Sequence, residues 1–235
     1  MSIRDMKGKV EDLIPVENVI VSVSDKRGLE LLIPGLMEIN PTVRFLSTGG
    51  TYTKIKDLLG GPSDNLLEVS EYTEFPEMEG GLVKTLHPKI HAGILGERNN
   101  PEHQKYLEML DGGVFMDMVV VNLYPFQKVI SSPDANFEMA RGNIDIGGPT
   151  MIRAAAKNFP SCAAVCNPGD YDGILEHITE NKGATSFSQR LKLARKVFEA
   201  TAEYERAIAD YFGEQIDSHL KEIEGLYKFE GEDDD

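Results

Sequence analysis

The chain has 235 residues, of which 41% are hydrophobic and 27% are charged, and its net charge is −15. This length can bury the core of one large domain, and the acidic balance argues against a nucleic-acid partner, whose phosphates need a basic surface. No apolar run approaches the roughly 20 residues of a membrane span, and the N-terminus lacks the apolar stretch of a secretion signal. We therefore expect a cytoplasmic protein without a membrane partner.

The first 160 residues alternate short apolar runs with amphipathic stretches. This pattern predicts strands at 18–24, 42–48, 66–70, 118–124 and 161–167, and helices at roughly 28–39, 50–60, 102–111, 133–141, 148–159 and 169–181. The first and fourth strands are almost continuously apolar, as in a parallel sheet covered on both faces. The alternation predicts an α/β fold with a doubly wound, mainly parallel sheet. Pro34 conflicts with this pattern, because it should kink or split the first helix.

Two cysteines, Cys162 and Cys166, lie in the run SCAAVCN. If that run is a strand, their Cα atoms are ~13 Å apart, which is beyond disulfide reach. No CxxC motif and no third soft ligand accompany them, so we expect buried thiols rather than a metal site.

The character of the chain changes after Thr185. The letters SFSQ at 186–189 fit a capping box, and the following residues have helical apolar spacing. We therefore divide the chain into a domain at 1–185, a C-terminal helical extension at 186–227 and an acidic tail at 228–235. The extension could pack on the sheet or on a second subunit, and the tail is expected to be solvated and disordered.

Two predicted strands run into small polar residues and then into a helix, in VSVSDKRG and FLSTGGTYTK. These turns offer hydroxyls, a cation and backbone N–H groups at helix N-termini, from Ser24, Lys26, Thr48, Gly49, Gly50 and Thr51. Such groups suit a phosphate. Strand–glycine–helix turns are also common for steric reasons alone, so two neighbouring turns count for more than either one.

The segment GGLVKTLHPKIHAGIL, at 80–95, concentrates cationic groups in an acidic chain. His87 and His91 are four residues apart, but Pro88 between them disfavours a regular helix that would align them, and no carboxylate ligand is adjacent. We therefore expect no metal here, and His91 is interpreted as a structural histidine. Lys84 follows a glycine pair, in a loop that can approach an anionic ligand closely, although a solvated role is the alternative.

The run VVVNLYPF places Asn122 and Tyr124 at the end of a predicted central strand. Period two puts both side chains on one face, where the sheet opens. A tyrosine packed in the core is the alternative, but an asparagine and a tyrosine ahead of a proline turn are typical of a ligand-facing edge.

A second cationic segment, NIDIGGPTMIRAAAKN, spans 143–158. Asp145 precedes a predicted helix and could either act in a site or cap that helix. Lys157 follows three alanines, which allow close packing and partial burial. Burial and nearby cations lower the pKa of a lysine, which would suit Lys157 for proton transfer. The alternative is that Lys157 is an ordinary surface lysine.

These motifs closely resemble the inosine monophosphate (IMP) cyclohydrolase domain, the N-terminal domain of the bifunctional purine-biosynthesis enzyme. The matching letters are SVSDK, TGGT, EFPEM-GG-VKTLHPKIHAGIL, NLYPF, IDIGG and RAAAKN, in that order, over roughly 18–212. The resemblance implies a methylglyoxal-synthase-like fold and closure of 5-formamidoimidazole-4-carboxamide ribonucleotide to IMP, without a cofactor. It also implies a homodimer. The transformylase half of that enzyme is not within these 235 residues, so a separate formyltransferase could supply the substrate, or the chain is an excised part.

The resemblance also implies residue roles. The catalytic residues would be Lys84, Tyr124, Asp145 and Lys157, and the substrate would contact Ser24, Asp25, Lys26, Thr48, Gly49, Gly50, Thr51, Thr85, Asn122, Ile146 and Gly147. Two positions depart from the family pattern: Leu82 stands where an arginine is usual, and Thr48 replaces a serine but keeps the hydroxyl.

The catalytic hypothesis is that Lys84 and the backbone N–H groups of the turn at 145–147 stabilise the oxyanion. Lys157, tuned by Tyr124 and Asp145, would move the proton needed for dehydration. Two other classes remain open. Methylglyoxal synthase would need a carboxylate base, for which Asp145 alone would have to serve. A nucleotide-sensing module would need the phosphate turns but not Lys84, Tyr124 and Lys157 together.

Overall fold

The structure, a computed structural model, describes residues 9–76, 78–79 and 82–227. Seven strands form two sheets among the described residues: β1 (Leu13–Pro15), β2 (Asn18–Val23), β3 (Arg44–Ser47), β4 (Leu66–Glu68), β5 (Met118–Asn122), β6 (Ala163–Val165) and β7 (Ala184–Ser186). The main sheet has the order β4-β3-β2-β5-β6 and is parallel throughout, whereas β1 pairs with β7 in antiparallel orientation. The α/β fold with a parallel sheet is therefore confirmed, including all five predicted strands.

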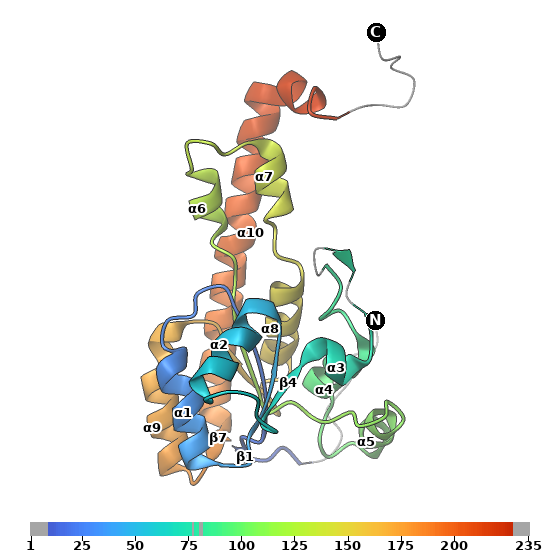
Figure 1. Ribbon diagram of the computed structural model, residues 1–235, viewed down its shortest axis with the longest axis vertical. Helices are drawn as coiled ribbons and strands as arrows, with labels where there is room; N and C mark the ends of the chain where they lie inside the picture. The colour runs from blue at the N-terminus through green and yellow to red at the C-terminus, as the bar shows by residue number, and fades with distance from the viewer. Residues whose placement is uncertain (1–8, 77, 80–81, 228–235) are drawn as a thin grey trace.

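Helices follow most of the strands. They are α1 (Leu29–Ile39), α2 (Gly49–Leu58), α3 (Val69–Thr73), α4 (Pro88–Leu95), α5 (Pro101–Glu108), α6 (Phe126–Ile130), α7 (Phe137–Gly142), α8 (Gly147–Lys157), α9 (Tyr171–Glu180) and α10 (Phe187–Glu224), with a short 3-10 turn η2 (Pro168–Asp170) before α9. The sheet and its flanking helices fill the lower part of the molecule in Figure 1, and α10 rises from there past α6 and α7.

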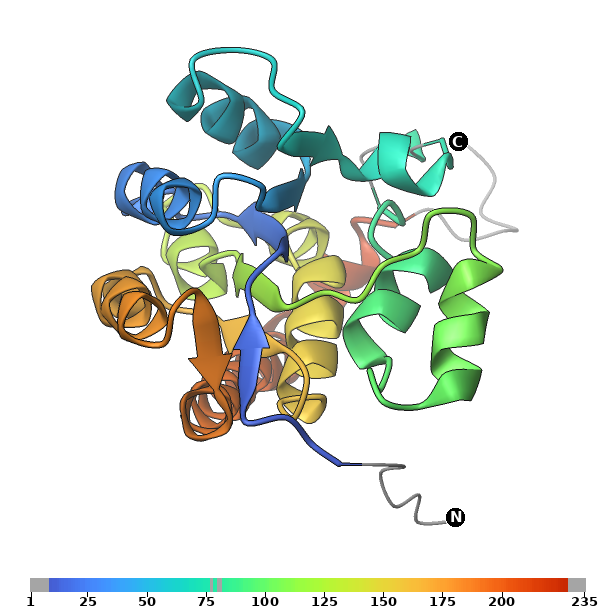
Figure 2. The same ribbon diagram turned by 90° about the horizontal axis from the view of Figure 1, so that it is seen from below.

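The central strands are buried on both faces, which explains their continuous apolar sequence. Val19 and Val21 of β2 join the core formed with α1, α2 and α9, whereas Ile20 joins the core formed with α4, α8 and α10. Figure 2, seen from below, shows the two helical layers on opposite sides of the sheet and the β1–β7 pair beside it. This arrangement leaves the ends of the parallel strands as the natural place for a ligand.

Two proline predictions are wrong. Pro34 lies inside α1, which continues as one helix of 11 residues through it. Pro88 does not prevent a helix; it is the first residue of α4, with His87 as the N-cap. The first turn of a helix has no internal partner for its N–H groups, so proline costs nothing there and its fixed φ favours helix initiation.

Several short elements escaped sequence prediction. The helices α3, α4 and α6 and the strands β1 and β7 have between three and eight residues, too few to show a clear period. The helix predicted at 133–141 is the shorter α7. Cys162 and Cys166 are both free thiols, as expected, although only Cys162 is fully buried.

The long helix α10 begins at a serine cap, as predicted. The hydroxyl of Ser186 accepts a hydrogen bond from the backbone N–H of Gln189 at 3.3 Å. The reciprocal half of the capping box does not form, because the buried Oε1 of Gln189 has no partner. At 38 residues the helix spans about 57 Å, and its one non-helical residue, His219, lies near the end. Its buried positions extend to Tyr204. The acidic tail at 228–235 lies outside the described residues.

Arg190 anchors α10 to three other parts of the chain. Its side chain is fully buried, and its guanidinium donates to the backbone carbonyls of Glu11, Asp12, Phe159, Pro160 and Thr185. Burial lowers the pKa of Arg190 to about 10, so the group stays cationic at neutral pH. Its charge is balanced by carbonyl dipoles that surround it.

Candidate active site

A cavity of about 400 Å³ opens at the carboxyl ends of β2, β3 and β5. The chain passes from β2 to β3 on one side, and β5 lies on the other side of β2, so the cavity is at the point where the strand order reverses. It is lined by Ser22, Val23, Ser24, Lys26, Thr48, Gly49, Gly50, Thr51, Leu82, Lys84, Thr85, Asn122, Tyr124, Gly142, Asn143, Ile144, Asp145, Ile146, Gly147, Gly148 and Met151. Thirteen of the predicted site residues are in this lining; Asp25 and Lys157 are not.

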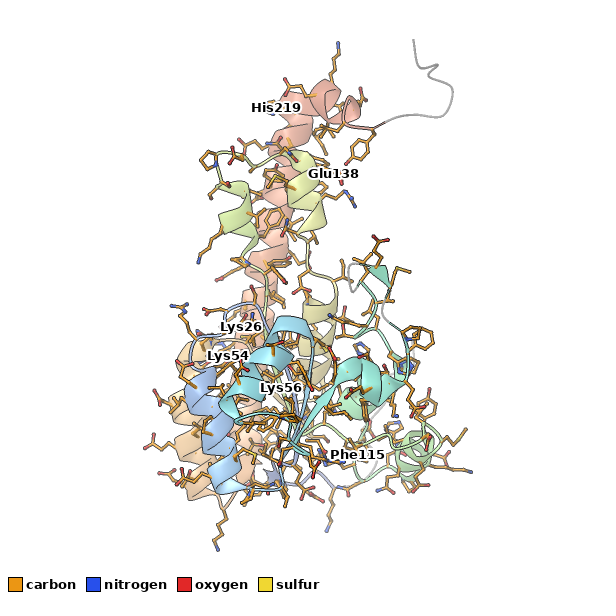
Figure 3. The ribbon with its side chains drawn as sticks, viewed as in Figure 1. Lys26, Lys54, Lys56, Phe115, Glu138 and His219 are labelled. Carbon is orange, nitrogen blue, oxygen red and sulfur yellow. The ribbon has the colours of Figure 1, made fainter. Side chains whose placement is uncertain are left out.

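Two lysines meet at the N-terminus of α2. A Cβ atom built on Gly49 would lie 3.7 Å from Nζ of Lys84, and one built on Gly50 would lie 3.8 Å from Nζ of Lys26. Figure 3 shows Lys26 above Lys54 and Lys56, at the upper edge of the layer that holds the sheet. The first N–H groups of a helix have no internal partner and carry partial positive charge. Two ammonium groups beside them make this corner of the cavity a site for an anion.

Hydroxyl groups surround this corner, but they are not equivalent. The Oγ atoms of Ser22 and Thr48 lie 2.9 Å apart, in a hydrogen bond whose direction can reverse when a ligand enters. Thr51 is different, because its hydroxyl donates to the carbonyl of Val23 and accepts the N–H of the same residue. Thr51 therefore connects the end of β2 to α2, and its hydroxyl proton is already engaged in the hydrogen bond to Val23.

Asn122 holds the turn after β2 in place. Its amide accepts a hydrogen bond from the N–H of Asp25 and donates to the carbonyl of the same residue, both at 2.8 Å. The Asp25 carboxylate accepts hydrogen bonds from the Arg27 guanidinium at both of its oxygens, which lowers the pKa of Asp25 to about 2. Asp25 lines a neighbouring hollow together with Asn122 and Tyr124 instead of this cavity, and its predicted contact with substrate stays a prediction.

The glycine pair after Asp145 is required by close contacts. A Cβ on Gly147 would lie 2.5 Å from Oγ1 of Thr85, and a Cβ on Gly148 would collide with the Asp145 carboxylate. The start of α8 therefore packs directly against the segment that carries Lys84. Without side chains at these two positions, the backbone of the turn can lie this close to Thr85 and to the Asp145 carboxylate.

Asp145 is held mainly by the backbone. Its Oδ1 accepts the N–H of Gly148 at 2.9 Å, so the helix-capping alternative is also correct. Burial raises the pKa of the Asp145 carboxyl above its usual range, and hydrogen bonds from the backbone of Gly148 and Tyr124 partly oppose that shift. A carboxyl whose pKa moves toward neutrality at the wall of a cavity is suited to accepting or donating a proton.

The structure places Tyr124 in the cavity, as predicted, but does not place Lys157 there. Tyr124 lines the cavity and is 54% exposed, which excludes the alternative of a tyrosine packed in the core. Lys157 is exposed at the last position of α8, about 15 Å along the helix from Gly147. The prediction of partial burial is wrong, because Ala155 and Ala156 turn toward the core and the next residue points outward. The structure does not bring Lys157 into the cavity.

The two histidines of the cationic segment also lie outside the cavity. Nδ1 of His87 accepts the N–H of Lys89 at the start of α4, and burial lowers the pKa of His91. His91 borders a separate apolar hollow between α4 and α5. Within residues 9–76, 78–79 and 82–227, no three His, Cys, Asp or Glu side chains lie close enough together to hold a metal ion.

Sequence reasoning missed some of the cavity wall. Ser22 is two residues before Ser24 in a strand, so the period-two rule could have placed both on one face. Asn143 and Met151 gave no comparable signal, because their approach depends on how the segment before α8 packs. Leu82, where the resemblance expects an arginine, lines the cavity and is 67% exposed, so an apolar side chain replaces a cation at the rim.

Comparison with known proteins agrees with this architecture. Residues 30–150 match the MGS-like domain family, and residues 155–233 match the AICARFT/IMPCHase bienzyme family. The Bifunctional purine biosynthesis protein PurH of Chlorobium phaeobacteroides (strain BS1) is 48% identical over 83% of this chain, and that of Leptospira biflexa serovar Patoc (strain Patoc 1 / Ames) is 43% identical over 87%. The chain spans only 36% and 38% of the length of these two relatives.

A solved structure is similar over almost its whole length. The crystal structure of ForH superposes with a TM-score of 0.70 and 32% sequence identity, covering 83% of this chain and 98% of that one. No helix within the described ranges is both long and apolar enough to cross a membrane. The matches to the two family models and to ForH show that the chain belongs to the family of MGS-like domains, in the group that includes the AICARFT/IMPCHase bienzymes.

Proposed function

We propose that this chain is an IMP cyclohydrolase, which closes 5-formamidoimidazole-4-carboxamide ribonucleotide to IMP in purine biosynthesis. The observation that carries the proposal is one cavity whose lining contains Lys26 and Lys84, beside a helix N-terminus, and also Asp145. The lysines suit the phosphate and a developing negative charge, and the carboxyl suits proton transfer. The relatives named as bifunctional purine biosynthesis proteins support the same pathway.

The reaction needs no external nucleophile. The carboxamide nitrogen attacks the formyl carbon of the same molecule, a C–N bond forms, and the formyl oxygen becomes an oxyanion. The attacking nitrogen loses one of its two protons and keeps the other. After protonation the former formyl oxygen leaves as water, while the formamido nitrogen loses its proton and forms the ring C=N bond. The protein has to hold the two groups face to face and move protons. Correct orientation supplies several kcal/mol, up to roughly 7–11 in intramolecular reactions.

Each wall of the cavity then has a task. Lys84 and the N–H groups of Ile146 and Gly147 stabilise the oxyanion, a contribution of about 3 kcal/mol for one donor in comparable sites. The N–H groups of Asp145 and Gly148 are already bonded, so they are not part of this group of donors. Asp145, with its raised pKa, accepts a proton from the attacking nitrogen, and Tyr124 lies beside it at the cavity mouth.

The other substrate contacts have supporting roles. We assign the phosphate and ribose to Ser24, Lys26, Thr48, Gly49 and Gly50, all in the cavity lining. Thr51 and Asn122 act through the backbone segments that they tie together, and Thr85 acts through its contact with the Gly147 turn. A homodimer and a separate formyltransferase that supplies the substrate stay predictions.

The test is to supply the formamido ribonucleotide and to follow IMP formation by ultraviolet absorbance. Replacing Lys84 with alanine should lower kcat/KM by roughly 100-fold or more, because about 3 kcal/mol of transition-state stabilisation is lost. Lys157→Ala should stay close to wild type, because the residue lies outside the cavity. Lys56→Ala, a change on the outer side of α2, is the surface control.

Three results would contradict parts of this proposal. Wild-type activity in Lys84→Ala would remove the oxyanion assignment. A large loss in Lys157→Ala would restore the role that the resemblance implies and would mean that the residue acts from elsewhere. Binding of IMP without any turnover by the wild-type chain would favour a nucleotide-sensing module instead.

A further inference from the structure

The long helix α10 contacts a residue of the cavity lining, Asp145, through the side chain of Tyr204. We propose that Tyr204 is a positioning residue, which holds the loop of Asp145 and the turn of Tyr124 in their working geometry. This inference rests on the proposed function for its kinetic part. Its structural part, the ordering of the Asp145 loop by Tyr204, can be tested without turnover.

The first contact is a direct hydrogen bond. The hydroxyl of Tyr204 accepts the backbone N–H of Asp145 at 2.8 Å, across 59 positions of the chain. The side chain of Tyr204 is only 9% exposed, so water competes little for this bond. Losing a buried hydrogen-bond partner leaves the N–H group of Asp145 unsatisfied, and a loop moves to avoid that state.

The second contact is with the turn that follows β5. The ring of Tyr204 meets the ring of Phe126 edge to face, with 6.4 Å between the ring centres. Phe126 is almost fully buried, and its N–H donates to the carbonyl of Tyr124 at 2.8 Å. One tyrosine thus touches both segments that deliver the proposed catalytic side chains Tyr124 and Asp145.

The chemistry depends on this placement because, in the part of the chain that the structure describes, the Asp145 carboxyl is bonded to backbone groups. Its carboxyl is fixed by the N–H of Gly148 and the backbone of Tyr124, so its position follows the backbone of the loop. A displacement of about 1 Å at a reacting group can cost roughly 100-fold in rate. Burial raises the pKa of Tyr204, so the phenol remains neutral and can hold the loop at every working pH.

Tyr211 provides a matched control on the same helix. Its ring also packs against Phe126 edge to face, at 5.7 Å between ring centres, and stacks on Phe137. It packs against the same small hydrophobic cluster as Tyr204, whereas the hydroxyl bonded to Asp145 is that of Tyr204. Tyr211→Phe therefore removes a hydroxyl from the same environment without touching the Asp145 loop.

The experiment compares Tyr204→Phe with Tyr211→Phe in the full chain. Tyr204→Phe keeps the ring contacts, so we expect kcat for IMP formation to fall roughly 10- to 100-fold with KM within about threefold, as for a lost positioning contact. Amide hydrogen exchange at Asp145 should become faster in Tyr204→Phe and stay unchanged in Tyr211→Phe.

Each other outcome overturns the inference. Unchanged exchange at Asp145 in Tyr204→Phe would mean that the hydroxyl does not order the loop, whether or not the wild type turns over. Faster exchange with unchanged kcat would remove the positioning role. Equal losses of kcat in both variants would point to general packing. A wild-type chain without turnover refutes the proposed function and with it the kinetic part, whereas exchange still decides the structural part.

Discussion

Single residues in this cavity owe their roles to how the backbone presents them. Lys84 was identifiable from the sequence because its glycine-rich loop can approach a ligand. In the structure its ammonium group lies beside Gly49, the first residue of α2. Lys157 looked equally suitable, but helix geometry alone turns it outward, and no letter in RAAAKN indicates that direction. The sequence shows Arg27 two residues after Asp25, but only the structure shows that the two side chains pair.

The thiols give a prediction at the same scale. Burial raises the pKa of Cys166 to about 11, so the fraction of reactive thiolate is small at neutral pH and grows about tenfold for each pH unit below 11. Labelling of native protein with iodoacetamide, read by mass spectrometry, should show this slope at Cys166. Cys162, which is fully buried, should stay unlabelled until denaturant is added. Rapid labelling of Cys166 at pH 7 would contradict the assignment.

Whole elements were predictable where their apolar period was long enough. Helices α1, α2, α8 and α9 follow such periods. The five strands of the main sheet lie within longer apolar runs, which located even β4 and β6 with three residues each. The shorter α3, α4 and α6 do not, and Pro88 was misread because its effect depends on whether it begins a helix or interrupts one. The sequence does not show that a buried arginine fixes α10. The five acceptors of Arg190 are main-chain carbonyls, and main-chain acceptors leave no side-chain pattern in the sequence.

Arg190→Lys tests that fixation. A lysine has three donors from a single nitrogen and cannot reach five carbonyls in fixed directions, so buried acceptors lose their partners. We expect the free energy of unfolding to fall by about 2–4 kcal/mol, measured by urea denaturation. Arg195→Lys on the same helix is the control, because Arg195 is exposed and pairs with Glu199, a contact worth less than about 1 kcal/mol. Equal effects in the two variants would contradict the anchoring role.

On the scale of the whole molecule, the cavity is a small cationic site in a chain of net charge −15. The long-range field repels an anionic nucleotide, whereas the two lysines attract it only at short range. Added salt screens the long-range part first, since the Debye length is ~8 Å at physiological ionic strength. The association rate of IMP should therefore rise when salt increases from low to physiological concentration.

Stopped-flow binding measures this dependence. Lys26→Ala should slow association and weaken binding at every salt concentration while keeping the sign of the salt effect. An association rate that falls steadily with salt would mean that the local cations dominate the approach, contrary to the prediction from net charge.

The distance along α10 between Arg190 and Tyr204 has a consequence of its own. Arg190 is fixed to five main-chain carbonyls and Tyr204 to the Asp145 loop, and the two residues are 14 positions apart in the helix. Adding or removing a single residue would rotate one contact by about 100° relative to the other and shift it by about 1.5 Å. Exposed positions such as Leu191 and Arg195 can change in kind, but the number of residues between the two contacts cannot change.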